Sequence, residues 1–166
     1  MAKAQLEATK GEENFDYNVY VDASFRPASD SSTGKNQATW GLHVNNRDGV
    51  RVIDDVPDKG DAPVDIKHSG EAEFYAAYKG LQWILEKGSG KVRLLTDSKT
   101  VYDQADDRRP EPKNPVKYRD ECISLIHEIK ATGTEYYLEW ISRADNDEAD
   151  EMATKAAKDQ GYCKKK

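Results

Sequence analysis

The sequence predicts one mixed α/β domain built on a five-stranded sheet, with three antiparallel strands followed by two parallel strands. Three observations lead to this prediction. Segments of alternating apolar and polar residues near the start of the chain are joined by short links, as in an antiparallel meander. Later strand-like segments are separated by segments of helical periodicity, as in parallel crossovers. The length of 166 residues fits one domain of ordinary size.

Composition excludes several classes of protein. Charged residues make up 34% of the chain, but 3 Trp, 9 Tyr and 3 Phe supply the large side chains of a core, so global disorder is excluded. No run approaches the ~20 apolar residues of a membrane span, and the first residues lack the apolar core of a signal peptide. We therefore expect a cytoplasmic protein with no membrane partner. Its two cysteines match no metal-ligand spacing and are expected to be free thiols.

The net charge is −6, which argues against a nucleic-acid partner, because phosphate binding normally requires a basic surplus. That argument fails if some of the carboxylates hold cations. Nothing in the sequence indicates an oligomeric surface, so we expect a monomer.

The first half of the chain predicts a tail and three strands. Residues 1–16 show no apolar period and are expected to form a flexible tail, before a domain over 17–160 and a second tail over 161–166. The strands are predicted to begin at Tyr17 and to span residues 38–44 and 50–56. A loop is expected over 26–37, and a tight turn over 45–49, where the sequence is NNRDG.

The second half alternates helices with strands. Phe74, Ala77, Tyr78 and Leu81 recur at helical spacing, with Ser69 as the expected N-cap and Gly88 as the stop. The predicted elements are a helix over 70–87, a strand over 91–96, a short helix over 98–105, a helix over 116–130, a strand over 134–141 and a helix over 146–158.

Three carboxylates occupy positions where a purely structural role does not readily explain an acidic residue. Asp22 lies inside the first predicted strand, where Asp has low propensity and is costly to bury unpaired. Asp97 directly follows the apolar strand ending in LLT, and ligands of open α/β sheets usually bind beyond such strand ends. Glu73 lies in the first turn of a predicted helix. Taken singly, each also has a structural explanation. Asp22 could be a buried Asp with hydrogen-bond partners, Asp97 a helix cap, and Glu73 an acid that interacts with the helix dipole.

These acids converge if the first and fourth strands are neighbours and the first helix packs across them. Carboxylates a few Å apart repel one another unless they are protonated or share cations. Mg²⁺ and Mn²⁺ favour such oxygen clusters, so a negative domain can still bind a polyanion through metal ions.

The sequence resembles the ribonuclease H family, type 1. The resemblance runs from about Tyr17 to Ala157 and rests on four motifs in order: YVDAS, GEAEFYAAYKGL, LLTDSKTVYDQ and WISRADNDEADEMATKAA. It implies a ribonuclease H-like fold, with the family's catalytic and metal-binding acids at Asp22, Glu73, Asp97 and Asp150.

The resemblance also implies an activity. An endoribonuclease of this family hydrolyses the RNA strand of RNA–DNA hybrids by two-metal-ion catalysis and leaves 5′-phosphate and 3′-hydroxyl ends. Two Mg²⁺ ions, which Mn²⁺ could replace, are the expected cofactor, and the hybrid duplex is the expected partner. Candidate substrate-binding residues are Ser24, Ser69, Ser98, Arg143 and Asn146.

Two departures suggest an archaeal or Gram-positive-like branch. The link before the last helix is short and has no histidine, which leaves Arg143 as a candidate phosphate contact. Residues 106–115 are too few for the basic handle with which many members grip the duplex. Two alternative functions remain open at this stage: a catalytically silent nucleic-acid-binding domain of the same fold, and a nuclease acting on double-stranded RNA.

Overall fold

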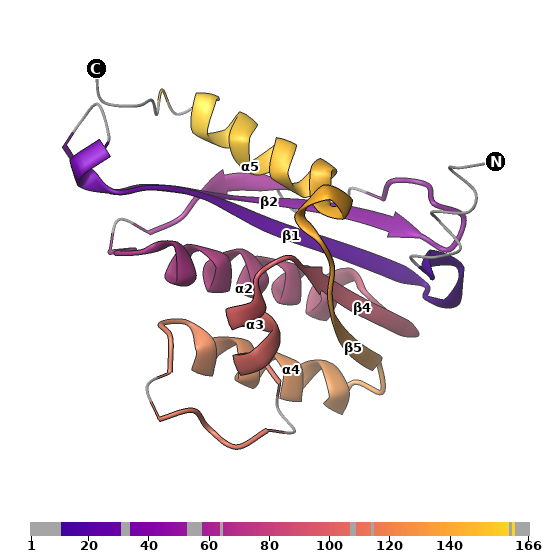
Figure 1. Ribbon diagram of the computed structural model, residues 1–166. Helices are drawn as coiled ribbons and strands as arrows, with labels where there is room; N and C mark the ends of the chain where they lie inside the picture. Colours follow the sequence, from indigo (N-terminus) through magenta and orange to yellow (C-terminus); the bar gives the residue numbers. More distant parts are fainter. Residues whose placement is uncertain are drawn as a thin grey trace.

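Five strands form a mixed sheet in the order β3-β2-β1-β4-β5 (Figure 1). The computed structural model describes residues 11–30, 34–52, 58–63, 65–106, 109–113, 115–159 and 161. The strands are β1 (Tyr17–Arg26), β2 (Gln37–Asn46), β3 (Lys59–Asp61), β4 (Lys91–Thr96) and β5 (Glu135–Trp140). The helices are α2 (Ser69–Lys87), α3 (Lys99–Gln104), α4 (Arg119–Ala131) and α5 (Asp147–Asp159), with short 3₁₀ turns η1 (Glu12–Asn14), η2 (Ala28–Asp30) and η3 (Arg143–Asn146).

The pairing of the strands confirms the predicted sheet. β2 is antiparallel to both β1 and β3, whereas β4 is parallel to β1 and β5 is parallel to β4. Each parallel connection passes through helical segments, as a crossover between parallel strands commonly does.

The location of the third strand was predicted wrongly. The tight turn over 45–49 forms, with the N–H of Gly49 donating to the carbonyl of Asn46 at 3.0 Å. Beyond it, residues 50–52 pair with β2 through one bridge between Arg51 and Asn45 and two backbone hydrogen bonds, from the N–H of Asn46 to the carbonyl of Val50 and from the N–H of Val52 to that of Val44. Residues 53–57 lie outside the described residues. The far end of β2 pairs instead with β3. Val50, which began the predicted strand, is 58% exposed, whereas Val52 packs against the main core.

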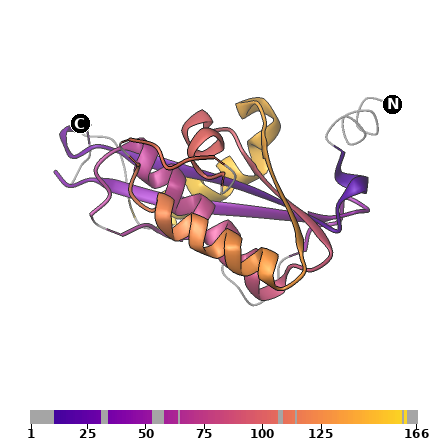
Figure 2. The ribbon, with the colours of Figure 1, turned by 90° about the horizontal axis from the view of Figure 1, so that it is seen from below.

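Helices cover the two faces of the sheet. α2 packs against β1 and β2, and α4 packs on α2 (Figures 1 and 2). α5 crosses the opposite face over β1 and β2. The main core fills the space between the sheet and α2 and includes Val19, Val21, Leu42, Phe74 and Leu94.

Packing begins before the predicted domain boundary at Tyr17. Phe15 and Glu12 are buried, and the amide of Asn18 donates to the carbonyl of Glu12 at 3.1 Å. The guanidinium of Arg93 lies over the Phe15 ring, 4.6 Å from its centre. Residues 1–10 and 162–166 of the predicted tails lie outside the described residues.

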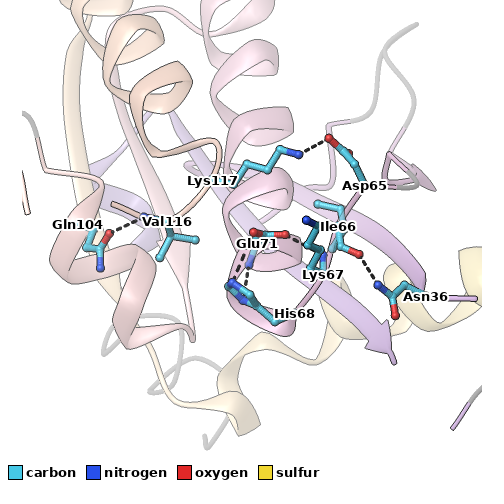
Figure 3. Close-up of polar contacts among 9 residues, drawn as sticks. All are labelled: Asn36, Asp65, Ile66, Lys67, His68, Glu71, Gln104, Val116 and Lys117. Atoms are coloured by element: carbon cyan, nitrogen blue, oxygen red, sulfur yellow. Dashed lines mark hydrogen bonds and ion pairs between the residues drawn. The ribbon is translucent and has the colours of Figure 1, made fainter. Parts of the chain in front are cut away.

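The entry into α2 differs from its predicted form. His68, rather than Ser69, is the N-cap, and its Nδ1 accepts a hydrogen bond from the N–H of Glu71 at 3.4 Å. The Glu71 carboxylate in turn accepts from the N–H of Lys67 at 2.7 Å (Figure 3). These reciprocal contacts resemble a capping box with imidazole in place of a hydroxyl. The stop at Gly88 is confirmed.

α4 begins at Arg119, three residues later than predicted, because the preceding segment is bonded elsewhere. The N–H of Val116 donates to the side chain of Gln104, and Lys117 pairs with Asp65 (Figure 3). Tyr118 then adopts φ 74°, a left-handed conformation that separates this segment from the helix.

Among the described residues, no helix is both long enough and apolar enough to cross a membrane.

Gly41 is the residue at which α5 approaches the sheet most closely, and we predict that Gly41→Ala destabilises the fold by about 3 kcal/mol. A Cβ at this position would lie 2.4 Å from the backbone nitrogen of Ala153 and 2.5 Å from the carbonyl oxygen of Ala149. Urea unfolding measures the loss. Gly70→Ala is the control, because its Cβ would meet only the imidazole of His68 and the edge of Val116 and should cost far less. Equal losses at both positions would contradict the close approach.

Candidate functional site

Two of the predicted acids lie side by side because of the register between β1 and β4. The last paired residues of these parallel strands are Val21 and Thr96. Asp22 and Asp97 follow them directly, so both carboxylates lie at the same end of the parallel sheet. Asp22 is 4% exposed, whereas Asp97 is half-buried.

The third acid comes from α2. Glu73 lies near the start of this helix, between Ala72 and Phe74, whose side chains are buried against the protein interior. Packing of α2 across β1 brings its carboxylate to the strand ends. One carboxylate oxygen from each of Asp22, Glu73 and Asp97 lies within 4.8 Å of the other two.

Asp150 borders this cluster without belonging to it. It is exposed in the first turn of α5 and is not one of the three carboxylates that meet within 4.8 Å. It nevertheless acts on the cluster: hydrogen bonding and charge repulsion from Asp150 both contribute to the raised pKa of Asp22. The sequence therefore identified four acids, of which the structure groups three and places the fourth beside them.

Burial and mutual repulsion raise the pKa values in the cluster. Burial, followed by the charge of Asp97, raises the pKa of Asp22 to about 8. Burial and the charges of Asp22 and Asp97 raise the pKa of Glu73 well above its usual value, and Arg143 opposes this shift. Without a cation, the cluster therefore holds protons near neutral pH.

The residues fit a divalent cation. Carboxylate oxygens are the ligands that Mg²⁺ and Mn²⁺ prefer. The Oε2 atom of Glu73 is buried and has no hydrogen-bond partner in the structure. A buried carboxylate oxygen without a partner is costly, and a metal ion would supply the missing interaction.

Asn146 ties η3 to the cluster. Its side chain is fully buried, and its Nδ2 donates to the carbonyl of Val21 at 2.9 Å and to Oδ2 of Asp97 at 3.2 Å. The sequence predicted Asn146 as a substrate-binding residue. In the structure its amide nitrogen bonds to the protein, while its Oδ1 is buried and has no hydrogen-bond partner among the described residues.

The other predicted substrate-binding residues lie around the same end of the sheet. Ser98 is the N-cap of α3, and its Oγ accepts from the N–H of Val101 at 3.2 Å. Ser24 is half-buried on β1, two residues after Asp22, and Ser69 is exposed at the start of α2. Arg143 is exposed on η3, close enough to the cluster to act on the pKa of Glu73.

Trp140 is a residue that sequence reasoning missed. It pairs with Thr96 across β4 and β5, and its indole Nε1 donates to the backbone carbonyl of Asp97 at 3.1 Å. It therefore fixes the backbone that carries one of the acids. The sequence did contain a signal for it. The tryptophan ends the last predicted strand, and when that strand is aligned with the LLTD segment, it lies beside the end of that segment.

Comparisons with known proteins place the chain in a family and a fold. A family model described as reverse transcriptase-like matches residues 33–156. No curated protein matches the chain in sequence.

Solved structures share the fold at low sequence identity. A ribonuclease H1 from the halophilic archaeon Halobacterium salinarum is 22% identical with a TM-score of 0.64, covering 86% of this chain and 98% of its own. The N-terminal RNase H domain of Rv2228c from Mycobacterium tuberculosis is 20% identical, with a TM-score of 0.61 and coverages of 84% and 98%. LC11-RNase H1, solved in complex with an RNA/DNA hybrid, is 18% identical, with a TM-score of 0.65 and coverages of 87% and 98%.

The raised pKa of Asp22 predicts how pH affects the stability of the metal-free protein. The carboxyl ionises near pH 4 in the unfolded chain but at about 8 in the folded one. Its contribution to stability is therefore complete below about pH 4 and is lost as the pH rises toward 8. Asp22→Asn removes this loss, so the variant should gain stability over the wild type across this range, reaching about 5 kcal/mol at pH 8.

Urea unfolding in EDTA at several pH values measures this difference. Asp48→Asn, in the exposed turn after β2, is the matched control and should show no such trend. A difference between Asp22→Asn and wild type that stays constant from pH 4 to 8 would contradict the repulsion in the cluster.

Proposed function

The chain belongs to the reverse transcriptase-like family, and from this premise we propose that it is a metal-dependent endoribonuclease that hydrolyses the RNA strand of RNA–DNA hybrids. The observation that carries the proposal is the meeting of Asp22, Glu73 and Asp97 within 4.8 Å at the end of the parallel sheet. Support for the substrate comes from a protein of the same fold, LC11-RNase H1, which was solved with an RNA/DNA hybrid.

Two divalent ions are the proposed cofactor, with Mg²⁺ as the expected metal and Mn²⁺ as a substitute. Asp22, Glu73 and Asp97 would hold them, with Asp150 completing the set from α5. When bound, such ions supply a nucleophilic water and neutralise the charge that develops at the phosphate. They also explain how a chain with a net charge of −6 can bind a polyanion.

Residues of the chain hold these ligands in place. The amide of Asn146 orients Asp97 through its Oδ2 atom, and the indole of Trp140 fixes the same residue through its carbonyl. Such contacts restrain a ligand before the metal arrives, which reduces the ordering that binding requires. Arg143 presents an exposed cation beside the cluster, where a substrate phosphate would lie.

Recognition of the hybrid would depend on its shape rather than on its base sequence. The minor groove of such a duplex displays the 2′-hydroxyl groups that distinguish RNA from DNA. Ser98 accepts one bond through its Oγ in capping α3, and its hydroxyl hydrogen has no acceptor among the described residues, so it could donate to the duplex. Ser24 and Ser69 are the further candidates around the cluster. The products would carry 5′-phosphate and 3′-hydroxyl ends, and we expect the protein to act as a monomer in the cytoplasm.

Activity on three labelled duplexes tests the proposal. The purified protein is incubated with an RNA–DNA hybrid, double-stranded RNA and double-stranded DNA, each with Mg²⁺, Mn²⁺ or EDTA. We expect internal cleavage of the RNA strand of the hybrid with either metal and none with EDTA. Cleavage of double-stranded RNA instead would support the alternative nuclease. Binding without cleavage of any duplex would support the catalytically silent domain.

Asp97→Asn should abolish cleavage of the hybrid, with a loss of at least ~100-fold, because it removes a charged ligand from the cluster. Circular dichroism should show an unchanged fold. The same hybrid assay provides the measurement, and Asp48→Asn, an exposed Asp outside the cluster, should retain wild-type turnover. Wild-type turnover in Asp97→Asn would remove Asp97 from the mechanism.

Arg143→Ala should weaken cleavage about tenfold without abolishing it, because one charge-assisted contact to a phosphate is lost. Initial rates across a range of salt concentrations measure the effect. Arg47→Ala serves as the control, because Arg47 is an exposed arginine paired with Asp16 in the turn region after β2. Kinetics and salt dependence equal to wild type would show that Arg143 has no contact with the substrate.

A further inference from the structure

A groove between α3 and β5 lies directly beside the acidic cluster. Its volume is about 610 Å³, within the usual range for small-ligand sites. The lining residues are Lys99, Tyr102, Asp103, Glu139 and Trp140. α3 and β5 pack on each other at the end of the sheet where Asp97 follows β4 (Figure 1).

Trp140 gives this groove an exposed aromatic surface in a fixed position. Its side chain is 43% exposed, whereas Trp40 and Trp83 are 5% and 2% exposed. The hydrogen bond from its Nε1 to Asp97 anchors the indole edge and leaves part of the ring open to solvent. An aromatic ring held in this way loses little conformational freedom when a ligand stacks on it.

The charges of the groove leave one cation available. The carboxylate of Glu139 lies 2.6 Å from Arg93, and that of Asp103 lies 3.6 Å from Arg109, so both acids have cationic partners. The ammonium of Lys99 lies over the Trp140 ring, 5.6 Å from its centre, in a cation–π contact. Within the part of the chain that the structure describes, Lys99 has no carboxylate partner.

We propose that this groove binds an unpaired nucleotide of a nucleic-acid strand, with the base stacked on Trp140 and a phosphate bound by Lys99. Aromatic rings bind single-stranded bases through their faces, and a neighbouring cation binds the backbone. A base inside a duplex shows only its edges, so a partly exposed aromatic ring suits an unpaired base, which would take the place of Lys99 on the ring while Lys99 turns to a phosphate. The identity of the ligand rests on the proposed function, since that function brings a nucleic acid to Asp97.

A groove at this position favours a substrate that carries a single-stranded segment next to the hybrid. Trp140 lies in the same row of the sheet as Thr96 and Val21, the residues that precede two of the cluster's acids. Neighbouring strands are about 4.8 Å apart, so the groove is within a few nucleotides of the cluster. A hybrid flanked by a single-stranded extension would occupy both the groove and the cluster. We expect the RNA of such a hybrid to be cut faster near the junction than the RNA of a blunt hybrid.

Tryptophan fluorescence of the full chain in EDTA tests the proposal without catalysis. The probes are a decamer of deoxyadenylate and an abasic decamer of the same length and charge. Since Trp140 is the exposed tryptophan, the adenine decamer should quench the fluorescence and the abasic decamer should not. Trp140→Phe should remove this quenching and weaken binding about tenfold, measured independently by anisotropy of a labelled decamer.

Lys99→Met gives a second test that keeps the tryptophan. It should weaken binding and lower the slope of log K against log salt concentration by about 0.7, the value for one phosphate of a single strand. Lys155→Met, an exposed lysine on α5, is the matched control and should leave the slope unchanged.

Several results would overturn the proposal: no binding of the adenine decamer, binding without quenching, equal quenching by the abasic decamer, or quenching that persists in Trp140→Phe. Cleavage of a blunt hybrid in Mg²⁺ is measured in parallel. Cleavage without quenching would reject the groove while the proposed function stands. Quenching without cleavage would support the groove while the proposed function fails.

Discussion

The parallel pairing of β1 with β4 is the constraint on which the site depends. Because Val21 and Thr96 are the last residues of this pair, the two following residues, Asp22 and Asp97, leave the sheet together. A shift of one residue would turn one side chain to the opposite face and break up the cluster. The register is held by the buried apolar residues of both strands, whose exposure is close to zero. Core packing thus holds together a group of charges that repel one another.

α5 brings the remaining polar groups to this strand end through an unusually close contact with the sheet. Gly41 gives its backbone room, and the hydroxyl of Thr39 donates to the carbonyl of Ala153 at 2.7 Å. The segment before α5 is then tied down by Asn146, whose amide bonds to both β1 and Asp97. These uncharged contacts offset part of the cost of crowding carboxylates, and they place Asp150 where its charge acts on Asp22.

Local patterns in the sequence predicted the elements with strong periodicity, including α2 and β4, and the sequence of antiparallel and then parallel strands, and they singled out the three clustered acids. They failed where tertiary contacts decide the structure. β3 is three residues long, Lys59–Asp61, and has no apolar alternation to mark it. α4 starts late because the N–H of Val116 bonds to Gln104. The contact between Trp140 and Asp97 joins residues that are 43 positions apart, so it becomes visible only when β4 and β5 are aligned.

The central claim is that the cluster of Asp22, Glu73 and Asp97 holds divalent metal. Anomalous diffraction from crystals soaked in Mn²⁺ tests it most directly, because the signal locates the ion without reference to activity. We predict anomalous density between these three carboxylates, including one contact with the buried Oε2 atom of Glu73, which has no hydrogen-bond partner among the described residues. The absence of anomalous density between these carboxylates, at a Mn²⁺ concentration that fills other sites on the same molecule, would contradict metal binding by the cluster.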